Sequence, residues 1–130
     1  MLAALWWGSL TTTGFLVVPM LFAHLATPAI AGRMAAELFA AQTWVALGCG
    51  LTLLIHVRAR AEDDRLDGAA LTAIFLVVTA MLLALLQQYA VAPRIVAREN
   101  LQLWHSAGSV MYVAQWLCAG ALLWRLSRRA

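Results

Sequence analysis

The chain has 130 residues, of which 64% are hydrophobic and only 12% are charged, and its net charge is +3. A domain this short has too little interior to bury so much apolar surface in water, which excludes a soluble globular protein and predicts an integral membrane protein. The basic residues are all arginines near the ends of apolar segments, a distribution typical of membrane proteins rather than of nucleic-acid-binding proteins.

Four apolar stretches, each close to the roughly 20 residues that a bilayer core requires, predict an all-α fold of four transmembrane helices. We expect a single transmembrane domain over residues 1–130, with spans at residues 2–25, 38–57, 69–91 and 101–124. The connections are short, so successive helices should run antiparallel in an up-down bundle. Asp67 is expected to cap the third helix, and Glu62, Asp63 and Asp64 before it belong to a solvated turn.

The arginines also predict the orientation of the bundle. With four spans, both termini and the middle connection share one end. Six of the nine arginines lie at this end: Arg58, Arg60, Arg65, Arg125, Arg128 and Arg129. Arg33, Arg94 and Arg98 lie at the other end. Because positive charge is retained on the cytoplasmic side of membranes, we expect both termini in the cytoplasm.

The spans contain residues that predict helix distortion and helix contacts. Pro19 should kink the first helix, because proline lacks an amide hydrogen and frees the carbonyl of Phe15. The threonines at residues 11–13 can hydrogen-bond the backbone or a neighbouring helix. Tryptophans near the span ends, among them Trp6 and Trp7, predict an aromatic belt. Close helix approach is expected at five glycines: Gly8, Gly48, Gly50, Gly108 and Gly120.

A short motif, Pro-x-Ile-x-x-Arg, occurs at residues 28–33 and again at residues 93–98. The copies are 65 residues apart, half the chain, and each is expected at the start of a returning helix. This favours two helical hairpins related by a pseudo-twofold axis along the membrane normal. The alternative is that two loops on one side of the membrane use the same residues, proline to open the loop and arginine to meet the headgroups.

Polar side chains within the spans gather toward the end opposite the termini, so a ligand site is expected to open there. His24 in the first span and His105 in the fourth lie on helices that are neighbours in an up-down bundle, and a haem b could be held between them. The alternative is that both are interfacial histidines, hydrogen-bonded to neighbours such as Gln87 or Arg94.

Copper is a second ligand hypothesis for the same end. Met20 and His24 are four residues apart on one helix face, and together with His105 they offer the thioether and imidazole groups that copper accepts. The alternative is that the methionine contributes only to packing.

A quinone or a lipid headgroup is the third ligand hypothesis. Gln87, Tyr89 and His105 could hydrogen-bond either one, and Arg94 suits an anionic headgroup. Ser109 lies one turn after His105, on a stripe that continues through Tyr112 and Trp116. The alternative is that the tyrosine anchors the helix at the membrane interface and the arginine extends toward the headgroups.

The chain resembles the transmembrane protein 205-like family, whose bacterial members are known as domain of unknown function 4149. The resemblance is carried by Leu5-Trp6-Trp7-Gly8-Ser9, Val18-Pro19-Met20-Leu21-Phe22, Ala92-Pro93-Arg94-Ile95 and Leu103-Trp104-His105-Ser106. It implies a four-span helical bundle and no established reaction, and we expect the chain in a bacterial inner membrane. A more distant similarity is to copper-resistance membrane protein D-like proteins. Tyr112-Val113-Ala114 lacks the asparagine common further along the fourth span, so only His105 and Ser109 match there.

An enzyme is not expected, because the predicted spans hold no carboxylate and no nucleophile paired with a base. The expected role is a structural or accessory subunit of a larger membrane complex. The expected partners are the lipid bilayer and other membrane subunits or further copies of the chain. The alternative is a membrane protein that binds haem b, copper or quinone through histidines at the end opposite the termini.

Overall fold

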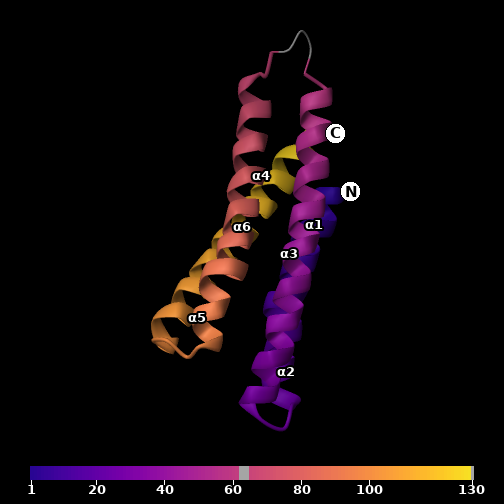
Figure 1. The fold of residues 1–130 in the computed structure, drawn as a ribbon. Helices are drawn as coiled ribbons and strands as arrows, with labels where there is room; N and C mark the ends of the chain where they lie inside the picture. The colour runs from indigo at the N-terminus through magenta and orange to yellow at the C-terminus, as the bar shows by residue number, and fades with distance from the viewer. Residues whose placement is uncertain (62–64, 130) are drawn as a thin grey trace.

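The computed structural model describes residues 1–61 and 65–129, and within these ranges the regular structure is entirely helical (Figure 1). Four helical segments are long and apolar enough to cross a membrane. The all-α, four-helix architecture is therefore confirmed. The elements in chain order are α1 (Leu2–Thr12), the π-helical turn η1 (Thr13–Val17), α2 (Val18–His24), α3 (Pro28–Ala59), α4 (Gly68–Leu86), the π-helical turn η3 (Gln87–Val91), α5 (Ala92–Val96) and α6 (Leu101–Ser127).

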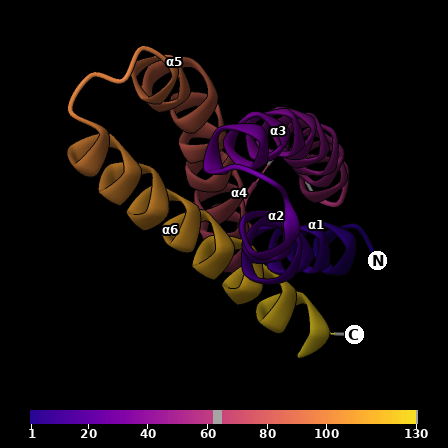
Figure 2. The same ribbon diagram turned by 90° about the horizontal axis from the view of Figure 1, so that it is seen from below.

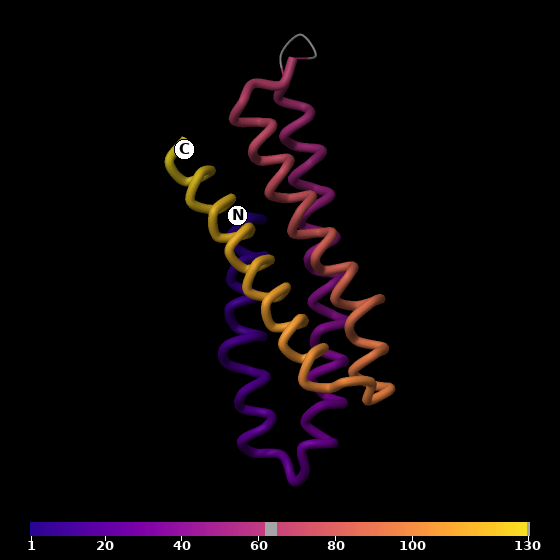
Figure 3. Tube along the Cα trace, turned by 90° about the vertical axis from the view of Figure 1, so that its left-hand side faces the viewer, coloured from indigo at the N-terminus to yellow at the C-terminus, as the bar shows by residue number. Residues whose placement is uncertain are grey.

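The four segments form a closed arrangement in which each packs against two others. The α1 segment contacts α3 and α6, and α4 also contacts α3 and α6. Both chain ends and the connection between α3 and α4 lie at one end of the bundle, here called the terminal end (Figures 1 and 3). The α3–α4 hairpin extends beyond α1 and α6 at the terminal end. At the opposite end, α6 diverges from α2 (Figure 2).

The second span begins earlier than the hydropathy pattern indicates. We expected a loop over residues 26–37, but α3 starts at Pro28, because Thr27 caps it by accepting a hydrogen bond from the Ile30 amide (3.2 Å). The resulting 32-residue helix is about 48 Å long, well beyond a hydrocarbon core of about 30 Å. Arg33 and Glu37 therefore lie on a helix and not in a loop.

The third span begins as predicted. The Asp67 carboxylate accepts a hydrogen bond from the Ala70 amide (2.7 Å), which confirms it as the N-cap of α4. Glu62, Asp63 and Asp64, which we assigned to a solvated turn, lie outside the described residues.

Both the first and the third span contain a π-helical turn shortly before a proline. The turn η1 precedes Pro19 and the turn η3 precedes Pro93, and each proline is the second residue of the short α-helix that follows. A π-turn shifts the backbone hydrogen-bond register where proline cannot donate. The distortion expected at Pro19 is therefore present as a widened turn.

The same observation corrects the proposed motif repeat. Pro28 opens the returning helix α3, but Pro93 lies within the third span, before the turn that leads to α6. The expectation that both motif copies start a returning helix is therefore wrong. The setting of Pro93 matches that of Pro19 instead. A pseudo-twofold relation between the two hairpins remains a prediction. The feature that the first and third spans share is a π-helical turn followed by a proline.

The core is built from small residues at the helix interfaces around a few large side chains. Trp6 is completely buried, so its assignment to an aromatic belt is wrong.

Close helix approach is confirmed at Gly50, which faces α4, at Gly108, which faces η3, and at Gly120, which faces α1. It is wrong for Gly8 and Gly48, where no described atom lies within 4 Å of an added Cβ.

Candidate functional site

The two histidines predicted to share a haem or a copper ion lie on separate parts of the bundle. His24 is the last residue of α2 and is exposed, with its Nδ1 3.0 Å from the carbonyl oxygen of Met20 on the same helix. His105 is exposed near the start of α6, which diverges from α2 at this end (Figures 1 and 2). In residues 1–61 and 65–129 no three His, Cys, Asp or Glu residues cluster as metal ligands. The joint histidine site therefore rests on sequence alone.

The other predicted ligand residues are largely engaged with their own helices. The Arg94 guanidinium lies 4.6 Å from the centre of the Trp104 ring and donates to the Ala90 carbonyl (2.6 Å). Ser109 donates to the carbonyl of His105 (2.9 Å). Gln87 is partly buried and Tyr89 is exposed, both on η3. The structure therefore places these groups at one end of the bundle without converging them on one point.

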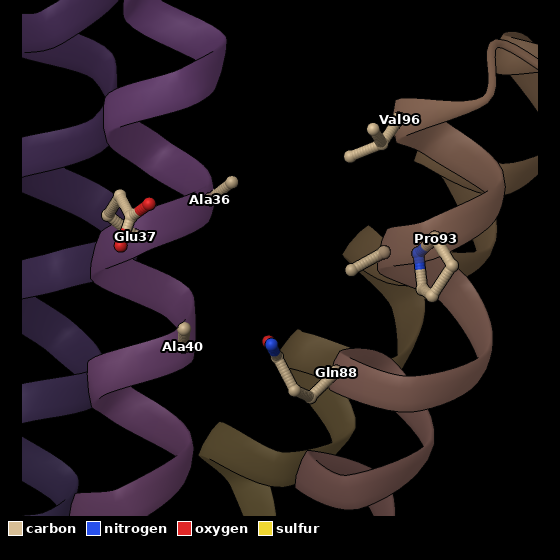
Figure 4. A pocket seen from close by; sticks show the side chains of 7 residues that line it. Ala36, Glu37, Ala40, Gln88, Pro93 and Val96 are labelled. Carbon is tan, nitrogen blue, oxygen red and sulfur yellow. The ribbon is translucent and has the colours of Figure 1, made fainter.

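A cleft of about 270 Å³ lies beside these residues, between α3 and the η3–α5 segment (Figure 4). The Gln88 side chain extends into the gap toward Ala36 and Ala40 (Figure 4). Glu37 and Val96 also line it. Its walls are mainly methyl groups, and its volume lies at the lower limit of small-molecule sites, which span about 300–1,000 Å³.

A buried polar cluster joins the first and second spans in the middle of the bundle. Gln42 on α3 is 6% exposed. Its Nε2 donates to Ser9 Oγ (2.9 Å), and its Oε1 accepts from Thr13 Oγ1 (3.3 Å). Ser9 in turn donates to the carbonyl of Trp6 (2.8 Å). The amide of Gln42 thus links α3 to both α1 and η1.

Two hydrogen bonds attach α6 to the same part of the first span. The Tyr112 hydroxyl donates to the carbonyl of Leu10 (2.6 Å), and Trp116 Nε1 donates to Thr11 Oγ1 (2.8 Å). The phenol ring fits because residue 14 is glycine, where an added Cβ would lie 2.8 Å from Tyr112 Cζ. An edge-to-face contact with Phe39 on α3, with ring centres 5.4 Å apart, fixes the other side of the ring. Three spans therefore meet at Tyr112.

This mid-bundle polar cluster, defined by Ser9, Thr11, Thr13, Gln42, Tyr112 and Trp116, was only partly predicted from the sequence. The expectation that the threonines bond a neighbouring helix is confirmed at Thr11 and Thr13. Tyr112 was predicted only as part of a stripe on the fourth span, and neither Tyr112 nor Gln42 was predicted to bond the first span. The stripe on α6 divides, because Ser109 is exposed whereas Tyr112 is buried. The position of each residue along the span distinguishes the two, because the residue nearer the middle of α6 is the buried one. The prediction used residue type and did not use this position.

The chemistry of the mid-bundle polar cluster suits helix association. Its groups are hydroxyls, an amide, a phenol and an indole, which donate and accept hydrogen bonds. In hydrocarbon such bonds hold helices together, since lipid tails offer no competing partner. Two buried nitrogens in the described part of the chain, Trp6 Nε1 and Gln115 Nε2, have no hydrogen-bond partner.

Comparison with protein families gives a match over most of the chain. The model of the family described as Domain of unknown function (DUF4149) matches residues 1–103, which include the first three spans and the start of the fourth. No curated protein and no solved structure matches the chain. The match confirms the bacterial unknown-function part of the resemblance given above.

Proposed function

We propose that this chain, which belongs to the family described as Domain of unknown function (DUF4149), is a structural or accessory subunit of a larger membrane complex. Its four apolar helices make it a small multi-pass membrane protein. The proposal concerns what such a protein does in the membrane. It is supported by how the chain uses its polar groups and by one feature of its outward surface.

The interior of the bundle supports a structural role for the chain. The Gln42 amide bonds Ser9 and Thr13, and the Tyr112 and Trp116 donors bond the first span. All of these polar groups form hydrogen bonds between helices. The bundle thereby keeps a defined outer shape, which a stable contact with another membrane protein requires.

The outward face of α3 carries the observation on which the proposal rests. Trp44 is 69% exposed and lies more than about 20 Å along the helix from both ends of α3, and so near the middle of the span. The described chain supplies no hydrogen-bond partner to its indole N–H. Lipid tails supply none either, and exposed tryptophans normally lie at the membrane interface. A helix from another protein could supply the acceptor.

The surface next to Trp44 is shaped for such a helix. Gly48, one turn along, has no described atom within 4 Å of an added Cβ, so it leaves a shallow notch beside the indole. Small residues of this kind allow helix backbones to approach closely in membranes. Ala41 and Leu51 continue the exposed face on either side.

The test is co-purification in a mild detergent followed by native mass spectrometry. The wild-type chain should be released with a bound subunit, either another membrane protein or a further copy. Trp44→Ala should lose that subunit, and Leu82→Ala, at an exposed position near the middle of the third span, should keep it. A wild-type chain found only as the bare monomer, or equal assembly of both variants, would refute the proposal.

The same measurement tests the other expectations. A bound mass that disappears in His24→Ala or His105→Ala would identify a haem, copper or quinone ligand. The similarities to the transmembrane protein 205-like family and to copper-resistance membrane proteins remain predictions. The location in a bacterial inner membrane with cytoplasmic termini rests on the resemblance and on the arginine distribution, and labelling of single cysteines placed near each terminus tests the orientation.

A further inference from the structure

The terminal end of the bundle contains a hollow of about 900 Å³, larger than the cleft at the opposite end. It arises because the α3–α4 hairpin extends past the ends of α1 and α6 (Figures 1 and 3). All four spans contribute to its walls. Its volume falls within the range of about 300–1,000 Å³ that is typical of small-molecule sites.

The deep part of the hollow is apolar. Leu53 on α3 and Leu122 on α6 are buried there, and Val57 and Leu126 are partly buried. The α4 wall consists of small residues, which leave the space open: Ala69, Ala70 and Ala73. The floor therefore suits hydrocarbon and offers little to a free polar anion.

The rim of the hollow is strongly basic. Four exposed arginines line it: Arg60, Arg65, Arg125 and Arg129. Within residues 1–61 and 65–129, none of the four forms an ion pair with a carboxylate. Asp67 also lines the rim, but its carboxylate is engaged in capping α4 through the Ala70 amide (2.7 Å). The sequence adds Glu62, Asp63 and Asp64 between Ala61 and Arg65, outside the described residues.

We propose that this hollow binds an anionic glycerophospholipid from the membrane leaflet at the terminal end. Guanidinium groups bind phosphate through charge-assisted, often bidentate hydrogen bonds, so the four arginines would hold the headgroup. The first carbons of an acyl chain would lie against Leu53, Leu122 and the alanines of α4. A basic pocket between transmembrane helices with an apolar floor is the arrangement that recognises anionic headgroups.

The first test measures binding by native mass spectrometry of the whole chain, titrated with phosphatidylglycerol or with phosphatidylcholine carrying the same acyl chains. The wild-type chain should retain the anionic lipid and not the zwitterionic one. R60Q/R125Q should weaken the apparent Kd for phosphatidylglycerol about 30-fold, because one basic residue near an anionic surface contributes about 1 kcal/mol, or about fivefold. Arg33→Gln, at the opposite end of α3, should leave the Kd unchanged.

Two further variants separate lipid binding from misfolding and from binding of a free anion. R60K/R125K keeps the charge and should restore most of the affinity. Ala70→Leu fills the floor and should weaken lipid retention while leaving every arginine in place. Equal retention of the two lipids, or unchanged phosphatidylglycerol binding in R60Q/R125Q, would overturn the proposal. Normal lipid binding by Ala70→Leu, combined with displacement of the lipid by millimolar inorganic phosphate, would also overturn the proposal. That outcome would identify a site for a free anion.

Discussion

Gly14→Ala tests whether Tyr112 is fixed against the first span. An added Cβ would lie 2.8 Å from Cζ and 3.0 Å from the hydroxyl oxygen of the tyrosine. The ring cannot retreat easily, because its hydroxyl bonds Leu10 (2.6 Å) and its face meets Phe39. Either the helices separate slightly or the hydroxyl gives up its acceptor, so we expect the variant to lower the free energy of unfolding.

Gly48→Ala is the matched control, since its added methyl meets no described atom within 4 Å. Both substitutions gain about 1 kcal/mol of helix propensity by the scale for soluble helices, so this contribution cancels between them. Overpacking costs about 1–3 kcal/mol, and a hydrogen bond lost in a membrane costs about 0.6 kcal/mol. Because either consequence alone relieves the clash, Gly14→Ala should unfold more easily than Gly48→Ala by about 1–3 kcal/mol.

The assay is unfolding in mixed micelles, titrated with sodium dodecyl sulfate and followed by tryptophan fluorescence. In a Tyr112→Ala background the difference between the two alanine variants should disappear, because the clashing ring is gone. Equal stability of Gly14→Ala and Gly48→Ala in the wild-type background would refute the packing described around Tyr112.

Three further predictions use the same unfolding assay. Gln42→Leu should cost about 1 kcal/mol, because it removes two interhelical hydrogen bonds of about 0.6 kcal/mol each, whereas Gln102→Leu, at an exposed position on α6, should cost almost nothing. Trp116→Phe should cost about 0.6 kcal/mol by removing the single bond to Thr11, and a Thr11→Val variant should show no additional loss when combined with it. Asp67→Ala should cost about 1 kcal/mol by removing the cap of α4, and Asp67→Asn should recover most of it; equal losses in the two variants would contradict the capping role.

The helices were predictable because hydropathy over about 20 residues is a strong signal. Asp67 was predictable too, since a cap depends on residues next to it in the chain. The start of α3 was missed because Thr27 and Pro28 lie in a segment that mixes small apolar and charged residues, although these two residues are themselves a start signal. Local sequence therefore predicted the helices better than their exact ends.

The functional residues were harder to predict because they depend on how the helices cross. His24 and His105 lie on helices that are adjacent in the bundle order, yet α6 diverges from α2 at their end (Figure 2). Gln42 and Tyr112 meet the first span only because α1, α3 and α6 converge at mid-depth, where Gly14 admits the phenol ring. The hollow at the terminal end arises from unequal helix positions, which no single segment of sequence specifies.

The most direct test of the proposed role is photocrosslinking in intact membranes, with a crosslinking amino acid placed at position 41, beside Trp44 on the exposed face of α3, and, as the control, at position 82. We predict one discrete protein adduct from position 41, next to the indole N–H of Trp44 that lacks a partner in the described chain, and only lipid adducts from position 82, which is also exposed. Lipid adducts alone from both positions, or the same protein adducts from both, would contradict a subunit that docks through the face of α3.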